Sequence, residues 1–115
     1  MAQQHADALL VTADPENLTH RRLIVELAEK VRLPAIYPWR DYVQIGGLMA
    51  YAIDLKDAWR RVAGQVAQIL NGAHPAEMPY FQPTEVRLII NLKTARVLRI
   101  EIPSSLLTWA DEVIE

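Results

Sequence analysis

The chain has 115 residues, 51% of them hydrophobic, a formal net charge of -2 and no cysteine. This is enough apolar material for one compact core, and we expect residues 1–115 to form a single domain without disulfides, thiolate chemistry or a cysteine zinc site. Because basic residues are scattered among acidic ones, the chain lacks the basic surface that neutralises phosphates, and we expect no nucleic-acid partner.

The N-terminal stretch MAQQHADALLVTAD has no basic segment followed by a long apolar run, and no window of about 18 apolar residues occurs in the chain. We therefore expect a soluble protein without an export signal. It would be cytoplasmic if Met1 is the native start.

Four apolar segments have the length and composition of β-strands. A short continuous apolar run is typical of a strand covered on both faces, and alternation is typical of a half-buried strand. The expected strands are residues 8–13, 35–37, 48–52 and 84–90.

Apolar residues at helical spacing, with capping residues in front of them, predict helices between and after these strands. The longest should begin after Asp54. The last should begin at Ser104 or Ser105 and continue through Val113, with a frayed end, because acidic residues are unfavourable at a helix C-terminus. The other expected helices are residues 19–31, a short one after Pro38 and 92–98.

This alternation predicts right-handed βαβ units and a three-layer α/β fold, a mainly parallel sheet with helices on both faces. In such sheets, ligands bind beyond the carboxyl ends of the strands. The connections expected to line a site are therefore residues 12–17, 37–40 and 51–54.

The pattern does not gather residues with catalytic or metal-binding chemistry. His5, His20 and His74 fall in a tail, at a helix start and in a linker. Asp54 and Asp57 are better explained by helix capping and first-turn charge than by a metal pair. The chain has no phosphate-cradling glycine motif. We expect no enzyme activity, no catalytic residue, no metal site and no cofactor.

Aromatic residues at or just past the strand ends are the candidates for a binding site. Tyr37, Trp39 and Tyr51 form either the wall of a ligand cleft or ordinary packing. Asp14 either pairs with the amino group of a bound amino acid or only begins a turn. Gly47 either contacts a ligand or permits close approach before a strand. The predicted ligand-binding residues are Asp14, Tyr37, Trp39, Gly47 and Tyr51.

Three segments resemble one known family. GGLMAY before a long helix, then ILNGAHPAEMP, then INLKTARVLRIEIPSSLLTWADEVIE resemble, in order and spacing, the ABC-transporter substrate-binding proteins of the tryptophan/tyrosine-type solute-binding group. The resemblance covers residues 7–115. It implies one lobe of a type I periplasmic-binding fold, in which two α/β lobes close on a small solute and deliver it to a membrane permease.

The resemblance also implies a C-terminal portion of a longer protein. Family members usually begin with a signal or lipoprotein sequence, have an additional N-terminal lobe, and act in the periplasm or anchored outside the cytoplasm. Two positions depart from the pattern, since Ala52 and Arg99 stand where the family usually has glycine. Arginine lacks the freedom of glycine at positive φ, so the turn at Arg99 and Ile100 should be remodelled or strained.

Three functions are consistent with these observations. The first is the solute-binding component of an ABC import system, holding a small solute such as an aromatic amino acid without chemistry. The second is self-association as a homodimer, through apolar surface on residues 55–70 or 86–100 that would pack on the missing lobe. The third is a small flavodoxin-like enzyme or regulatory domain, for which the sequence shows neither a cofactor loop nor an acidic phosphoacceptor cluster.

Overall fold

The computed structural model describes residues 5–115, so the first four residues of the stretch examined for an export signal lie outside it. The chain divides into two compact units. Unit 1 comprises residues 1–52 and 87–115, and unit 2 comprises residues 53–86. The single domain expected over residues 1–115 stays a prediction.

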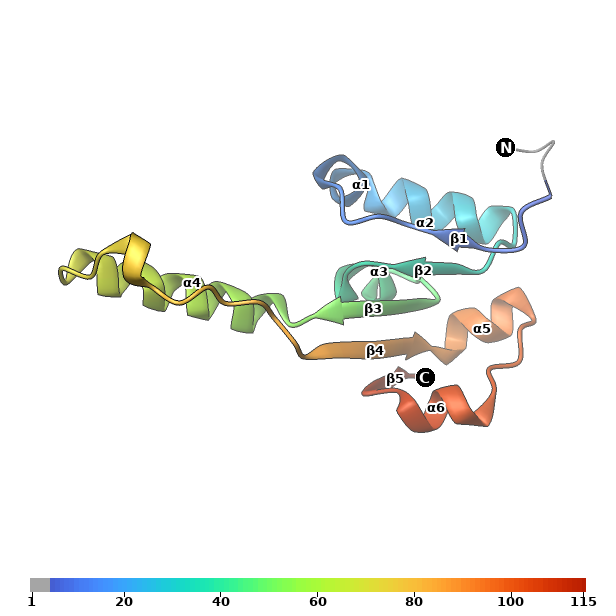
Figure 1. The fold of residues 1–115 in the computed structure, drawn as a ribbon. Helices are drawn as coiled ribbons and strands as arrows, with labels where there is room; N and C mark the ends of the chain where they lie inside the picture. Colours follow the sequence, from blue (N-terminus) through green and yellow to red (C-terminus); the bar gives the residue numbers. More distant parts are fainter. Residues whose placement is uncertain (1–4) are drawn as a thin grey trace. The chain divides into compact units, whose positions relative to one another are not determined.

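Unit 1 is built on a sheet whose described strands lie in the order β1-β2-β3-β4-β5 (Figure 1). The pairs β1–β2, β2–β3 and β4–β5 are parallel. The predicted mainly parallel α/β fold is therefore confirmed. The strands are β1 (Leu9–Leu10), β2 (Ala35–Tyr37), β3 (Met49–Ile53), β4 (Val86–Asn91) and β5 (Glu112–Ile114).

β3 and β4 run in opposite directions (Figure 1). The N–H of Asn91, at the end of β4, donates to the carbonyl of Leu48, just before β3, at 2.8 Å. A parallel pair would instead place the two strand beginnings together. β1, β2 and β3 consequently end at the edge of the sheet where β4 and β5 begin. We call this edge the strand-end edge.

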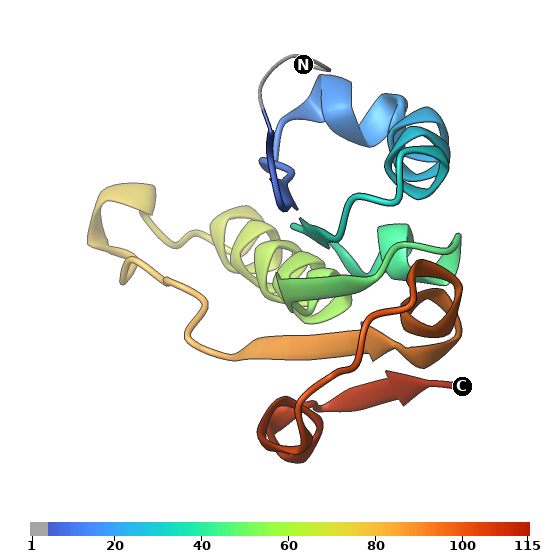
Figure 2. The ribbon, with the colours of Figure 1, turned by 90° about the vertical axis from the view of Figure 1, so that its right-hand side faces the viewer.

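Helices α2, α3 and α5 lie on one face of the sheet (Figure 2). Their buried side chains include Val25, Tyr42 and Leu98. α1 forms where we expected only a loop, because Asp14 Oδ1 accepts the N–H of Glu16 at 2.8 Å and a proline is tolerated in the first turn. The helices of unit 1 are α1 (Pro15–Thr19), α2 (Arg21–Lys30), α3 (Arg40–Gln44), α5 (Leu92–Leu98) and α6 (Ser104–Trp109).

The core of unit 1 lies between these helices and the sheet. In β3, Ala50 and Ala52 face this core and Tyr51 faces the other way, since successive side chains of a strand alternate. Asn91 joins the layers: its Oδ1 accepts the N–H of Thr94 and caps α5, and its Nδ2 donates to the Val43 carbonyl at 3.3 Å. The helix expected at residues 92–98 thus has a capping residue in front of it, as predicted.

The prediction for the C-terminus was wrong, because the last helix does not continue through Val113. α6 ends at Trp109, and residues 112–114 form β5. Asp111 explains the change. Its N–H donates to the Leu88 carbonyl and its Oδ2 accepts the Leu88 N–H, both at 2.8 Å. Pairing with β4 satisfies these backbone groups, whereas a helix through these residues would place acidic side chains at its negative end.

Arg99 ends α5 in the left-handed conformation, with φ 58° and ψ 41°. This conformation costs a non-glycine residue about 1–2 kcal/mol. The strained turn predicted at Arg99 and Ile100 is therefore confirmed. Arg32, which we had not singled out, also has a positive φ of 52° at the end of α2.

Unit 2 consists of α4 (Leu55–Leu70), a 3-10 turn at Pro75–Glu77 and an extended return segment. Asp54 caps α4 as predicted, accepting the N–H groups of Lys56 and Asp57. The Arg61 guanidinium lies 4.3 Å from the centroid of the Phe81 ring, which ties the return segment to the helix. No residue of α4 is buried.

No helix within residues 5–115 combines the length and the apolar character needed to cross a bilayer.

Candidate functional site

The strand-end edge of unit 1 carries charged and aromatic side chains from three strands. Asp14 follows β1 and is exposed. Trp39 and Arg40 follow β2, and Trp39 is half-buried against the core while Arg40 is exposed. Glu112 begins β5. Because β4 and β5 run opposite to β1, β2 and β3, the ends of β1 and β2 and the start of β5 lie at the same edge.

An ion pair connects two of these elements. Arg40 Nε donates to Glu112 Oε2 at 2.9 Å, and Arg40 Nη2 donates to Oε1 of the same carboxylate. The hydrogen bond to Arg40 is the main cause that lowers the pKa of Glu112, and it also raises the pKa of Arg40. The side chains remain 46% and 38% exposed. Such exposed pairs contribute at most about 1 kcal/mol to stability, so this pair is not a main support of the fold.

Asp14 acts as a helix cap in the structure. Its carboxylate accepts the Glu16 N–H, and nearby Asn17 donates to the carbonyl and hydroxyl oxygens of Thr12 at 3.3 and 3.2 Å. The turn-forming role is thus observed. The ligand contact of Asp14 stays a prediction.

Tyr37 and Gly47 lie together in the core, away from the surface. Tyr37 is 3% exposed and stacks on Tyr42, with ring centroids 4.9 Å apart and an interplanar angle of 16°. Burial, followed by the neighbouring Tyr42, raises the pKa of Tyr37 to about 12. A Cβ added to Gly47 would lie 2.7 Å from the Tyr42 carbonyl oxygen and 2.8 Å from the Tyr37 ring. Packing therefore accounts for both residues, and we leave them out of the site proposed below.

Tyr51 is 60% exposed, but it stands on the face of β3 opposite to Ala50 and Ala52. Trp39 packs on the core beneath the other face. Trp39 directly precedes Arg40 in the sequence and so lies next to the ion pair. The structure does not gather the three predicted rings into one wall. A ligand contact of Tyr51 stays a prediction.

A small cavity in unit 1 lies away from the strand-end edge. Its lining includes Leu33 and Leu48, which precede β2 and β3, and Thr94 of α5. Its volume of about 10 Å³ is close to the minimum for one water molecule. It is too small to hold a solute.

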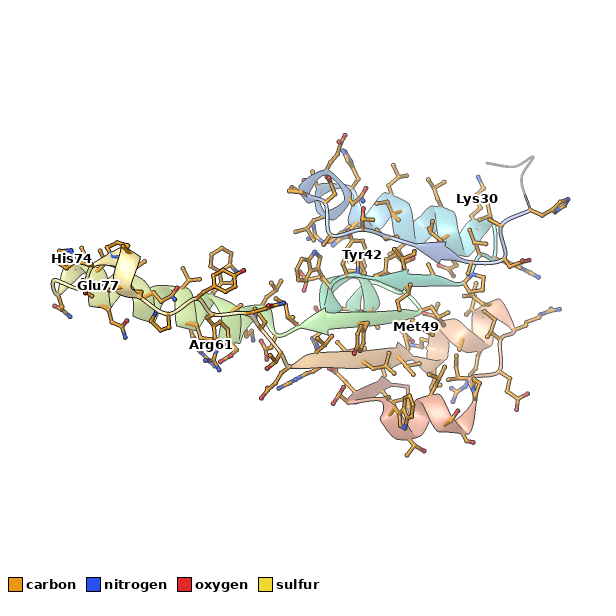
Figure 3. All side chains as sticks on the ribbon, in the orientation of Figure 1. Lys30, Tyr42, Met49, Arg61, His74 and Glu77 are labelled. Carbon is orange, nitrogen blue, oxygen red and sulfur yellow. The ribbon has the colours of Figure 1, made fainter. Side chains whose placement is uncertain are left out.

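Within residues 5–115, no group of three or more histidine or acidic side chains could hold a metal ion. His20 lies at the junction of α1 and α2, and His74 precedes the turn of unit 2 (Figure 3).

Sequence reasoning missed the pairing of Arg40 with Glu112. Arg40 lay within a connection expected to line the site, but Glu112 was assigned to a helix end. The available signal was the acidic charge of Asp111 and Glu112, which is unfavourable at a helix C-terminus and indicates that these residues do not belong to the helix.

The chain matches the family model of the ABC transporter substrate-binding proteins over residues 1–114. It is similar to a crystal structure of an ABC domain in complex with L-Trp from Streptococcus pneumoniae, with a TM-score of 0.88 and 30% identity over 95% of this chain. A conserved domain protein from Vibrio cholerae has the same fold, with a TM-score of 0.89 and 23% identity over 94% of this chain. A ligand-free, open substrate-binding protein with adhesive properties from Clostridium difficile has a TM-score of 0.61 and 21% identity over 93% of this chain. A search of curated proteins finds no match.

These findings define an α/β domain of the periplasmic-binding type. The chain belongs to the ABC transporter substrate-binding protein family. Proteins of this family are binding components of transporters, not enzymes. The chain spans 38% of the streptococcal structure and 36% of each of the other two.

Proposed function

We propose that the chain is the solute-binding portion of an ABC import system outside the cytoplasm, holding a small aromatic solute without chemistry and delivering it to a permease. The observation that carries the proposal is Trp39, a half-buried aromatic ring beside the charged Arg40 at the end of a parallel strand. A small solute site typically combines an apolar wall with a few polar groups. The streptococcal structure with bound L-Trp supports an aromatic amino acid as the solute.

Replacing Trp39 with alanine should weaken the binding of L-tryptophan about tenfold, equivalent to about 1.4 kcal/mol, because stacking area is lost. Isothermal titration calorimetry of the 115-residue chain measures this. Tyr80→Ala is the control for the loss of an exposed aromatic ring, since Tyr80 is 91% exposed in the return segment of unit 2. Binding that is indifferent to Asp14→Asn, Trp39→Ala and Tyr51→Ala together would contradict the proposal.

We also propose that two copies of the chain form a homodimer through the apolar side of α4. Within unit 2, Trp59 is 68% exposed and Leu70 is 82% exposed, and Val62 and Val66 on the same helix are nearly half exposed. A helix with an apolar stripe and no buried residue gains stability mainly by packing on a partner.

Light scattering at micromolar concentration should therefore give about twice the chain mass of 13.1 kDa. The double variant V62K/V66K should give the mass of one chain, because charge on the apolar side of α4 opposes burial. The control Q65K/Q68K adds the same charge to polar positions of the same helix and should leave the dimer intact. A monomer mass for the unmodified chain would reject the homodimer.

A further inference from the structure

Arg40 presents an oriented guanidinium at the strand-end edge. Glu112 holds it by two parallel hydrogen bonds, through Nε and Nη2, from a strand 72 residues away in sequence. A bidentate pair of this kind fixes the plane of the guanidinium as well as its position. The Arg40 side chain is 46% exposed, so solvent reaches it.

The guanidinium has donors that the protein does not use. Arginine carries five N–H donors, and Glu112 accepts two of them. Among residues 5–115, no group accepts a hydrogen bond from Nη1 or from the second hydrogen of Nη2. These remaining donors form the outer end of the fork, which matches the two oxygens of a carboxylate.

The surrounding charges do not exclude an anion. Asp41 and Arg87 lie near the pair, and Arg87 helps to lower the pKa of Glu112. These two residues, Arg40 and Glu112 sum to no net charge, but Asp14 and Asp111 at the same edge are acidic, so the free hydrogen-bond donors and not the net charge favour a carboxylate. A carboxylate satisfies them, whereas an ammonium group cannot.

Arg40 also lies beside Trp39, and Asp14 follows the neighbouring strand β1. An α-amino acid has a carboxylate, an ammonium group and a side chain. The strand-end edge offers a donor fork, a carboxylate and an aromatic ring on adjacent strands.

We propose that Arg40 receives the carboxylate of the solute, that Glu112 positions the guanidinium for this contact, and that the chain therefore selects aromatic solutes with a carboxylate over those without one. This assignment rests on the proposed function.

The test is a titration of the ¹⁵N-labelled 115-residue chain, followed by NMR, with three probes: L-tryptophan, indole-3-propionate, which lacks the amine, and tryptamine, which lacks the carboxylate. L-tryptophan and indole-3-propionate should bind and shift the Arg40 Nε–Hε resonance. Tryptamine should bind at least about tenfold more weakly than L-tryptophan.

Arg40→Gln should weaken L-tryptophan binding about tenfold or more and bring its affinity close to that of tryptamine. Arg40→Lys keeps the charge without the paired donors and should recover only part of the affinity. This variant also tests the carboxylate assignment if Arg40→Gln fails to fold. Arg61→Gln is the matched control, because Arg61 pairs with Asp57 at 2.8 Å with a similar exposure of 53%.

Glu112→Gln should broaden the Arg40 Nε–Hε resonance and weaken binding of the carboxylate probes without changing that of tryptamine, and Glu112→Asp should restore part of the affinity. Equal binding of L-tryptophan and tryptamine, unchanged in Arg40→Gln, would overturn the carboxylate assignment and leave solute binding intact. A folded chain that binds none of the three probes would overturn the proposed function, and this assignment with it.

Discussion

Replacing Tyr42 with alanine is expected to lower the free energy of unfolding by about 3–5 kcal/mol, the usual loss for a large buried aromatic residue. Tyr42 is completely buried at the centre of unit 1, and its ring stacks on Tyr37. The substitution removes this contact and leaves a cavity that α3 and the sheet cannot close. Urea denaturation followed by circular dichroism measures the change as a lower midpoint.

Tyr42→Phe is the matched control and should have the opposite or no effect. The Tyr42 hydroxyl is buried and has no hydrogen-bond partner among residues 5–115. Leaving a buried polar group unpaired costs about 1–3 kcal/mol, so removing the hydroxyl and keeping the ring should leave stability unchanged or raise it. A large loss of stability in Tyr42→Phe would show that the hydroxyl has a partner or a function that the structure does not reveal.

Replacing Gly47 with alanine is expected to destabilise the chain by about 1–3 kcal/mol, the range for overpacking a core. The new Cβ would lie 2.7 Å from the Tyr42 carbonyl oxygen and 2.8 Å from the Tyr37 ring. The carbonyl belongs to the backbone of a fully buried residue and cannot rotate away, so α3 would have to move from the sheet.

The same substitution at Gly64 should act in the opposite direction. Gly64 lies inside α4, and a Cβ there would meet nothing within 4 Å. Gly64→Ala should stabilise the helix by about 0.5–1 kcal/mol, the propensity difference between the two residues. Thermal unfolding of both variants measures the contrast. Equal effects at the two positions would show that the close approach of Tyr37 and Tyr42 does not require glycine at position 47.

Element types were predictable wherever local signals agreed. The amphipathic spacing of residues 55–70 and its Asp54 cap predicted α4, and Asn91 predicted the start of α5. The apolar run that ends at Asp14 and Pro15 predicted β1, and the runs that follow Pro34 and Gly47 predicted β2 and β3. In each case the spacing of the apolar residues and a capping or breaking residue indicated the same element. Sequence patterns are most informative under this condition.

The C-terminal segment failed for the opposite reason. Residues 106–113 fit helical spacing, and nothing local reveals that β4 lies open beside them. The Asp111 side chain and backbone bond to Leu88, which is 23 residues away in sequence, and this pairing overrides the helical pattern. The Arg40–Glu112 pair depends on the same strand and was missed with it.

The sequence by itself determined that this protein is an α/β domain of the substrate-binding family, because spaced motifs and hydrophobic periods are properties of the chain. Only the tertiary structure decided which aromatic residues are available for a solute. Tyr37 and Trp39 are two residues apart and looked equivalent, yet Tyr37 is sealed against Tyr42 while Trp39 remains half-buried at the strand-end edge. Burial of a side chain depends on what packs over it, and those neighbours come from parts of the chain that a local pattern does not include.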